Sequence, residues 1–146
     1  MKYNFYGGNT VSCTPIKDTY KNIHSPQELY DLLCDIWCVD TCAPRLRQEW
    51  TPENKTKGQC SITAFLAQDI FGGKVFGIPL GGEAIHCYNV VGEQIFDLTS
   101  EQFGEKASGL QYKDNPEQFR EIHFAKEEKK LRYEYLKKTL EEYLKK

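Results

Sequence analysis

Three residues in the middle of the chain have the types and the order of a nucleophile, a base and a group that orients the base. Cys60 opens the apolar stretch "CSITAFLAQDIF", His86 lies in "AIHCYNVV" and Asp97 lies in "QIFDLT". A thiolate attacks acyl carbons, an imidazole moves protons, and a carboxylate fixes the tautomer of the imidazole. The set predicts acyl transfer through a thioester that ends in hydrolysis or in transfer to an amine.

The position of Cys60 favours a reactive thiol. A helix N-terminus and a neighbouring imidazolium both stabilise a thiolate and lower its pKa. The chain has three histidines, His24, His86 and His123, and of these His86 lies within a predicted strand. Because a strand holds an imidazole in a fixed position, we expect His86 to be the partner of Cys60.

A predicted hairpin turn at residues 92–93 brings His86 and Asp97 together. If these two residues form the turn, Val91 pairs with Gln94. His86 and Asp97 then lie diagonally on one face of the sheet, within reach of each other. A slip of one residue in this register would move them to opposite faces.

The spacing of apolar residues predicts the elements that hold these side chains. A helix begins at the capping residue Ser25, and Pro44 ends it near residue 43. A second helix begins at Cys60 and stops at Gly72. Strands are predicted at residues 74–80, 84–91 and 94–99, and a charged amphipathic helix at about residues 126–146. This order predicts an α+β fold with helices packed on a small antiparallel sheet.

Length and composition favour one soluble domain. The 146 residues suit a single domain over residues 1–146, with a core at about residues 25–103. The net charge of −2 gives no basis for a nucleic-acid or membrane partner. No apolar run is long enough to span a bilayer, and "MKYNFYGGNTVSC" lacks the apolar segment of a secretory signal. We therefore expect a cytoplasmic protein that acts on a peptide or a small acyl compound and needs no cofactor.

The six cysteines are expected to be free thiols, ligands or nucleophiles in a reducing compartment. Cys34, Cys38 and Cys42 recur at every fourth residue and would line one face of the first helix. A metal or cluster site at these cysteines is one alternative. However, a helix spreads the three sulfurs over about 12 Å, which is too far for one tetrahedral ion. We expect buried or partly buried thiols.

A cysteine on a helix, a histidine on a strand and an aspartate on the next strand resemble the arrangement of papain-like and transglutaminase-like cysteine enzymes. The resemblance lies in the arrangement and not in a long stretch of sequence. In papain-like enzymes a glutamine six residues before the cysteine stabilises the oxyanion. Here Asn54 takes that place, and Gln59 is a competing donor. The resemblance implies that the Cys60 N–H is the second donor.

The stretch from about residue 50 to 103 is similar to a small bacterial family, the YunG family. The shared pattern includes "WTPEN", "GQC", "QDIFGG", "HCYN" and "DLTSEQF". This resemblance implies that these positions matter, and it names no reaction. The alternative to an enzyme is a binding protein of the same fold that holds a ligand above Cys60. It predicts an ordinary Cys60 pKa and no contact between His86 and Asp97.

Overall fold

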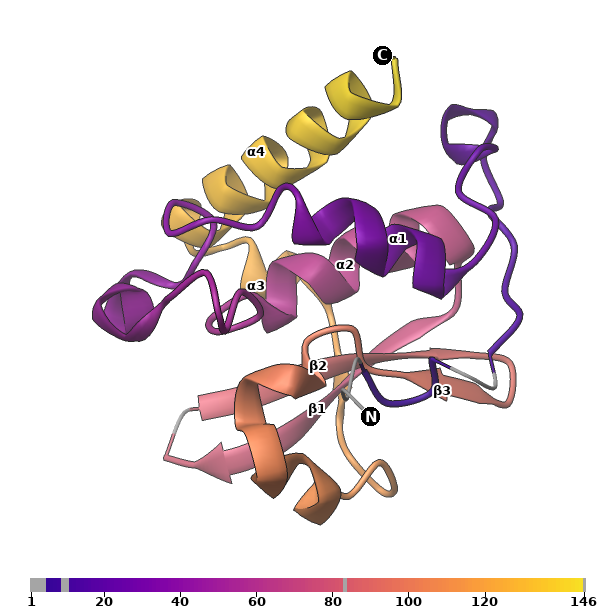
Figure 1. The fold of residues 1–146 in the computed structure, drawn as a ribbon. Helices are drawn as coiled ribbons and strands as arrows, with labels where there is room; N and C mark the ends of the chain where they lie inside the picture. The colour runs from indigo at the N-terminus through magenta and orange to yellow at the C-terminus, as the bar shows by residue number, and fades with distance from the viewer. Residues whose placement is uncertain (1–4, 9–10, 83, 146) are drawn as a thin grey trace.

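Helices cover one face of a small antiparallel sheet (Figure 1). The structure is a computed structural model, and it describes residues 5–8, 11–82 and 84–145. Among these residues the sheet has four strands in the order β3-β2-β1-β4. The strands are β1 (Lys74–Gly81), β2 (Ala84–Val91), β3 (Gln94–Phe96) and β4 (Glu117–Gln118). The chain thus has the α+β class that the sequence predicts.

The helices form layers above the sheet. They are α1 (Pro26–Cys34), α2 (Cys60–Phe71), α3 (Arg120–His123) and α4 (Glu127–Leu144). The chain also has three 3₁₀ segments among the described residues, η1 (Asp18–Tyr20), η2 (Pro44–Glu49) and η3 (Ser100–Gly109), of which η3 lies on the other face of the sheet. In Figure 1, α1 and α2 lie between the sheet and α4. Helix α2 therefore lies in the middle of the molecule, where it packs against both β2 and α4.

Helix α2 is mainly apolar, and nearly all of its residues are buried because it is enclosed by other elements. Ile62, Phe65, Leu66 and Ile70 are fully buried. Asn89 of β2 ties the helix to the sheet, since its Nδ2 donates to the Ala64 carbonyl oxygen at 2.8 Å. This packing fixes the position of the N-terminus of α2, where Cys60 lies.

Helix α1 begins as predicted and ends earlier than predicted. The Ser25 hydroxyl accepts a hydrogen bond from the Glu28 N–H at 3.2 Å, and Pro26 follows at the first helical position. The helix ends at Cys34, so the expected continuation to residue 43 is wrong. Beyond it the Thr41 hydroxyl bonds to both backbone groups of Cys38, and such local bonds compete with helix formation.

The end of α1 also separates three cysteines that were expected to share a helix face. Cys34 is the last residue of α1, whereas Cys38 and Cys42 lie in the following turns. Trp37 directs the chain toward α2, because its buried indole Nε1 donates to the Thr63 hydroxyl at 3.0 Å. The helical arrangement that would have aligned the three sulfurs is therefore absent from the described structure.

The hairpin between β2 and β3 has the register that the sequence predicts. Val91 pairs with Gln94, and Asn89 pairs with Phe96. Strand β3 ends at Phe96 and not at residue 99, because Asp97 pairs with Tyr6 instead. The Asp97 N–H donates to the Tyr6 carbonyl oxygen at 3.0 Å. A segment near the N-terminus thus holds Asp97 at the edge of the sheet.

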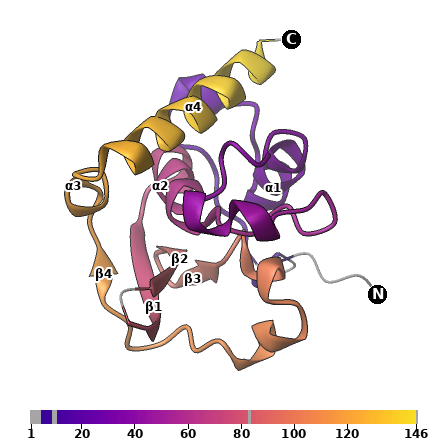
Figure 2. The same ribbon diagram turned by 90° about the vertical axis from the view of Figure 1, so that its left-hand side faces the viewer.

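The sheet face opposite α2 is covered by η3 and the segment that follows it, as Figure 2 shows. On this face Tyr88 stacks on Phe76 and meets the edge of Tyr112. Strand β4 pairs with β1 just after this segment.

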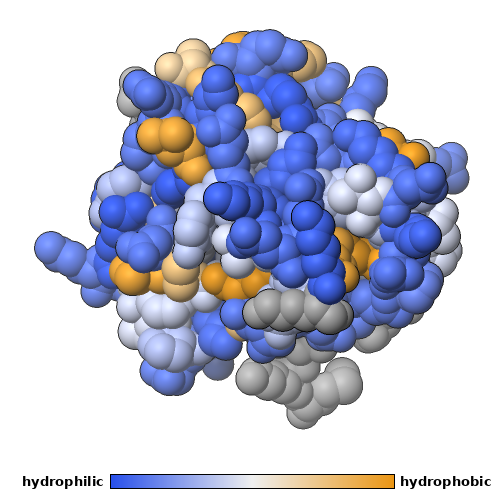
Figure 3. Space-filling view, turned by 90° about the horizontal axis from the view of Figure 1, so that it is seen from above, coloured by the Kyte–Doolittle hydropathy of each residue, from blue (hydrophilic) through white to orange (hydrophobic). Residues whose placement is uncertain are grey.

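The surface seen from above, on the α4 side, is mainly hydrophilic, with small separate apolar spots (Figure 3). This agrees with the charged amphipathic helix expected at the end of the chain, which the structure places at Glu127–Leu144. None of the described helices combines the length and the apolar character that crossing a membrane requires.

Candidate functional site

Cys60 lies at the first position of α2, beside the strand that carries His86. Its Sγ lies 3.7 Å from the Ile85 carbonyl oxygen, and its side chain is partly exposed. No side chain caps this helix N-terminus. Because the first N–H groups of a helix have no intrahelical acceptor, they favour negative charge on the Cys60 sulfur.

His86 and Asp97 form a buried pair. The His86 Nε2 and the Asp97 Oδ2 are 2.6 Å apart, and the two side chains are 1% and 0% exposed. The same Asp97 oxygen accepts the Tyr112 hydroxyl at 2.7 Å, and Oδ1 accepts the Thr99 N–H at 3.2 Å. Since the carboxylate only accepts, His86 donates through Nε2, and Nδ1 is left for another partner.

The topology of the sheet allows Cys60 to approach His86. Strand β3 pairs only with residues 89–91 of β2, so it leaves residues 85–88 open on that side, next to the start of α2. Cys60 and His86 both line one cavity of about 860 Å³. The buried His86 Nδ1 has no hydrogen-bond partner among the described residues. Phe103 packs edge-on against the imidazole, with ring centroids 4.8 Å apart.

The charges at this site favour a thiolate–imidazolium pair. A hydrogen bond from the Cys87 thiol lowers the Cys60 pKa. Burial opposes this and the neighbouring His86 lowers it further, so the pKa lies well below the ordinary value. Burial lowers the His86 pKa, but Asp97 and then Cys60 outweigh it and raise the pKa to about 10. Both shifts favour transfer of the Cys60 proton to His86, which would give a thiolate beside an imidazolium.

Cys87 is a member of the site that the sequence did not indicate. It is buried on the α2 side of β2. Its hydrogen bond to Cys60, followed by its burial, raises the Cys87 pKa well above the ordinary value. Cys87 therefore remains a thiol and donates to the Cys60 sulfur. Because neighbouring residues of a strand point to opposite faces of the sheet, the sequence indicates that Cys87 and His86 lie on different faces. It does not indicate that Cys87 lies beside Cys60 at the start of α2.

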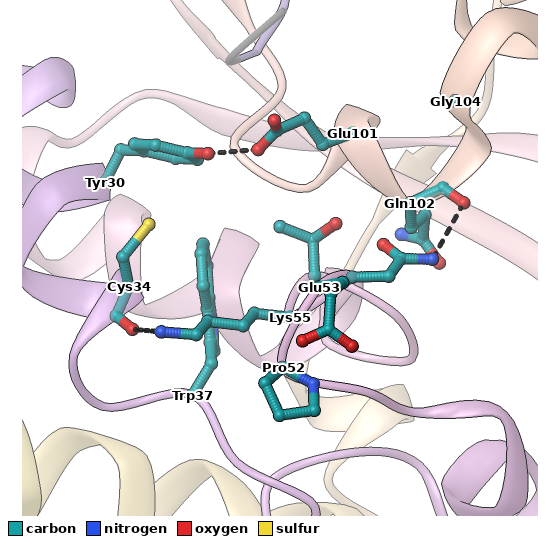
Figure 4. A pocket seen from close by; sticks show the side chains of 11 residues that line it. Tyr30, Cys34, Trp37, Pro52, Glu53, Lys55, Glu101, Gln102 and Gly104 are labelled. Carbon is teal, nitrogen blue, oxygen red and sulfur yellow. Dashed lines mark hydrogen bonds between the residues drawn. The ribbon is translucent and has the colours of Figure 1, made fainter. Parts of the chain in front are cut away.

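The structure does not bring the Asn54 or Gln59 side chain to Cys60. Gln59 is fully buried, and its Nε2 donates to the Cys38 carbonyl oxygen at 3.2 Å. Asn54 lines a separate cavity of about 510 Å³, and its Nδ2 lies 3.5 Å from the Gln102 carbonyl oxygen. Figure 4 shows this second cavity, between α1 and the start of η3. Spacing along the chain could not reveal that the loop before α2 turns both amides away.

Gln102 and Gln118 are the described amide side chains that line the Cys60 cavity, and Gln102 lies close to the loop before α2. Its Oε1 accepts the Gly58 N–H at 3.4 Å, and its Nε2 donates to the Thr99 carbonyl oxygen at 3.0 Å. The residue belongs to the "DLTSEQF" stretch, which was the available signal.

A metal centre at Cys34, Cys38 and Cys42 gains no support. Within the described ranges, no three His, Cys, Asp or Glu side chains gather closely enough to hold a metal ion. All six cysteines are free, and Cys42 is buried.

Comparison with known proteins agrees with the motifs around the site. The family model described as "YunG protein" matches residues 25–145. The "Uncharacterized protein YunG" of Bacillus subtilis (strain 168) is 44% identical over 55 residues, which cover 38% of this chain and 47% of that protein. The match thus spans about half the length of the relative. No solved structure matches this chain. The chain belongs to the YunG family.

Proposed function

We propose that this protein is a cysteine-dependent acyl-transfer enzyme, a hydrolase or an amine transferase. Cys60 is the nucleophile, His86 moves the protons, and Asp97 orients His86. One observation carries the proposal: His86 is buried and bound to Asp97 through Nε2, while its Nδ1 has no described partner beside the cavity of Cys60. A buried structural histidine normally satisfies its polar atoms, whereas a catalytic base needs one nitrogen available.

The first half of the reaction forms a thioester. The Cys60 thiolate attacks the acyl carbon, a C–S bond forms, and the carbonyl oxygen becomes an oxyanion. The unpaired N–H groups at the start of α2 suit this oxyanion, and the Gln102 amide lines the same cavity. The imidazolium of His86 then gives its Nδ1 proton to the leaving amine or alcohol as the bond from the acyl carbon breaks.

The second half releases the acyl group. Neutral His86 takes a proton from water or an amine through Nδ1, and the nucleophile attacks the thioester carbon. The C–S bond breaks and Cys60 leaves as the thiolate, which restores the ion pair. Asp97 keeps the Nε2–H in place through both steps. The reaction needs no cofactor.

We also propose that the fold is a reduced papain-like or transglutaminase-like core. The support is the chain order of Cys60 on a helix, His86 on a strand and Asp97 directly after the neighbouring strand. The free state of the six cysteines fits a reducing compartment such as the cytoplasm.

A ligand-binding protein without catalysis is the alternative. It predicts an ordinary Cys60 pKa and no contact between His86 and Asp97. The 2.6 Å contact and the lowered Cys60 pKa favour the enzyme.

The test uses p-nitrophenyl acetate, an activated ester, and follows the acetyl adduct by intact-protein and peptide mass spectrometry. We expect acetylation at Cys60 followed by its loss to water or to added hydroxylamine. His86→Ala slows acetylation by about 10²- to 10⁴-fold, the usual worth of a general acid–base group. Cys38→Ser is the matched control and leaves the rate unchanged. Acetylation at other cysteines only, or equally fast acetylation of Cys60 in His86→Ala, would contradict the proposal.

A further inference from the structure

Basic side chains surround the cavity that contains Cys60. Among the described lining residues, five are basic and one is acidic. They are Arg45, Lys57, Lys126, Lys129 and Arg132, against Glu128. The chain as a whole has a net charge of −2, so this concentration of positive charge is local. A cleft lined by one sign of charge attracts ligands of the other sign.

Three of these cations form no ion pair with a carboxylate of the described residues. Arg132 binds Glu128, and Lys57 lies 3.3 Å from Glu49. Within the described part of the chain, no ion pair joins Arg45, Lys126 or Lys129 to an acidic side chain. The three therefore leave positive charge on the wall of the cavity for a ligand.

Lys129 is the most informative of the three because it is partly buried. Its Nζ lies 2.9 Å from the His123 Nδ1, and the His123 Nε2 lies 2.8 Å from the Gln118 Oε1. Burial, and then the charge of Lys129, lower the His123 pKa to about 4. His123 is thus neutral near pH 7 and only accepts from Lys129. Since a buried charge is costly without a counter-ion, an anion in the cavity would stabilise Lys129.

Apolar side chains complete the wall. Leu80, Ile85, Phe103 and Ile122 line the same cavity. Its volume of about 860 Å³ suits a small molecule or a short peptide segment. The occupant therefore needs both an apolar part and a negative charge.

We infer that the substrate of Cys60 is an acyl compound with an anionic group, a carboxylate or a phosphate, which Arg45, Lys126 and Lys129 bind while the acyl carbon lies at the sulfur. The acyl part of this inference rests on the proposed function. The anion site rests on the charges alone and can be tested alone.

The test compares iodoacetate with iodoacetamide, two alkylating agents of similar size that differ in charge. The same thiolate attacks both reagents and displaces iodide, so the ratio of the two rates at one cysteine does not depend on the pKa of that cysteine. We expect the iodoacetate/iodoacetamide ratio at Cys60 to exceed the ratio at Cys38 by about tenfold at low salt, and to fall as salt screens the charges. Peptide mass spectrometry gives both ratios from one sample.

Substitutions of the two lysines test whether these cations cause the effect. Lys129→Gln and the exposed Lys126→Gln each lower the ratio at Cys60 by about threefold, the Coulomb effect of one nearby unit charge. Lys130→Gln, the neighbouring exposed lysine of α4 that does not line the cavity, leaves it unchanged. Succinate and inorganic phosphate are then added as competitors, and the one that slows iodoacetate at the lower concentration identifies the anion class.

Equal ratios at Cys60 and Cys38, or a ratio that survives the lysine substitutions, would overturn the inference. That outcome leaves acetylation by p-nitrophenyl acetate intact, so the proposed function would stand without an anionic substrate. A Cys60 that is not acetylated but prefers iodoacetate would instead support an anion-binding site and overturn the proposed function.

Discussion

Two cysteines of this protein each line a cavity, and the pKa values of their thiols are shifted in opposite directions from that of an ordinary cysteine. Cys60 opens α2 and lines the larger cavity, whereas Cys34 closes α1 and lines the smaller one (Figure 4). Both side chains are partly exposed. The Cys60 pKa lies well below the ordinary value, and the Cys34 pKa lies above it.

The difference arises from the partners of each sulfur. Burial raises the Cys34 pKa, and the hydrogen bond from Tyr30 and the charge of Lys55 only partly offset it. The Lys55 Nζ binds the Cys34 carbonyl oxygen at 2.7 Å, at the negative end of a helix. Cys60 has the positive end of a helix, a thiol donor and an imidazolium. A polar cavity is therefore not sufficient to activate a cysteine.

The largest expected effect is the difference in reactivity between these two cysteines. At about pH 7, iodoacetamide should alkylate Cys60 at least about a hundredfold faster than Cys34, because only the thiolate reacts. Peptide mass spectrometry of one time course gives both rates, with Cys38 as the internal reference. Similar rates at Cys60 and Cys34 would remove the contrast between the two cavities.

The second prediction concerns Asp97, the carboxylate that binds the histidine beside Cys60. Asp97→Asn removes the charge that holds the proton on His86, and the His86 pKa, about 10 in the intact protein, should fall by about two units. An NMR titration of labelled histidine measures the change. Asp40→Asn, at an exposed position, is the control and leaves His86 unchanged. An unshifted His86 in Asp97→Asn would show that the ion pair does not depend on Asp97.

The third prediction is the pH dependence of stability. The His86 pKa is raised above its ordinary 6.5, so its contribution is complete below pH 6.5 and is lost as the pH rises through about 10. The Cys60 pKa is lowered, so its contribution is complete above its ordinary 9.0 and is lost as the pH falls through the folded value. Above 6.5 the His86 contribution falls with rising pH, and below 9.0 the Cys60 contribution rises with it, so the two slopes oppose each other where these ranges overlap.

The free energy of unfolding of the wild type, relative to the double variant Cys60→Ala/His86→Gln, should therefore vary less with pH in that overlap than outside it. It should fall on either side by up to about 1.4 kcal/mol per pH unit, the limit for one proton. Urea unfolding at a series of pH values gives the curve. A steady decline from 6.5 to 9.0 would mean that His86 carries a raised pKa without a thiolate beside it.

The smallest expected effect belongs to Tyr112, whose hydroxyl donates to Asp97. Tyr112→Phe removes one of the donors to the carboxylate and should lower the free energy of unfolding by about 1 kcal/mol. Cys60 alkylation should change by less than about threefold, because the charge on Asp97 remains. Tyr135→Phe, at an exposed position, is the control. A complete loss of Cys60 reactivity in Tyr112→Phe would mean that the hydroxyl, rather than the carboxylate charge, keeps His86 protonated.

Short sequence patterns correctly predicted the helix start and the hairpin turn, because interactions between neighbouring residues determine both. The Ser25 cap and the turn at residues 92–93 depend on neighbouring residues, and both lie where the sequence places them. The turn sets the register of β2 and β3, and that register brings Asp97 to His86. This is why the central pair of the site could be predicted without a structure.

Contacts between distant segments were missed. Asp97 leaves β3 because Tyr6 supplies its backbone partner, and α1 ends at Cys34 where Trp37 reaches Thr63. A short stretch of sequence does not indicate which distant residues will contact each other. The same holds for the Cys87 contact with Cys60, which depends on how α2 packs on β2.

The most direct measurement is the rate of Cys60 alkylation by iodoacetamide as a function of pH, in the wild type and in His86→Ala, read by peptide mass spectrometry. The other five cysteines serve as internal controls. We expect an apparent pKa for Cys60 well below the reference of about 8.5, and a return toward that reference in His86→Ala. A Cys60 that titrates like an ordinary thiol in the wild type, or one that His86→Ala does not change, would contradict the thiolate–imidazolium pair.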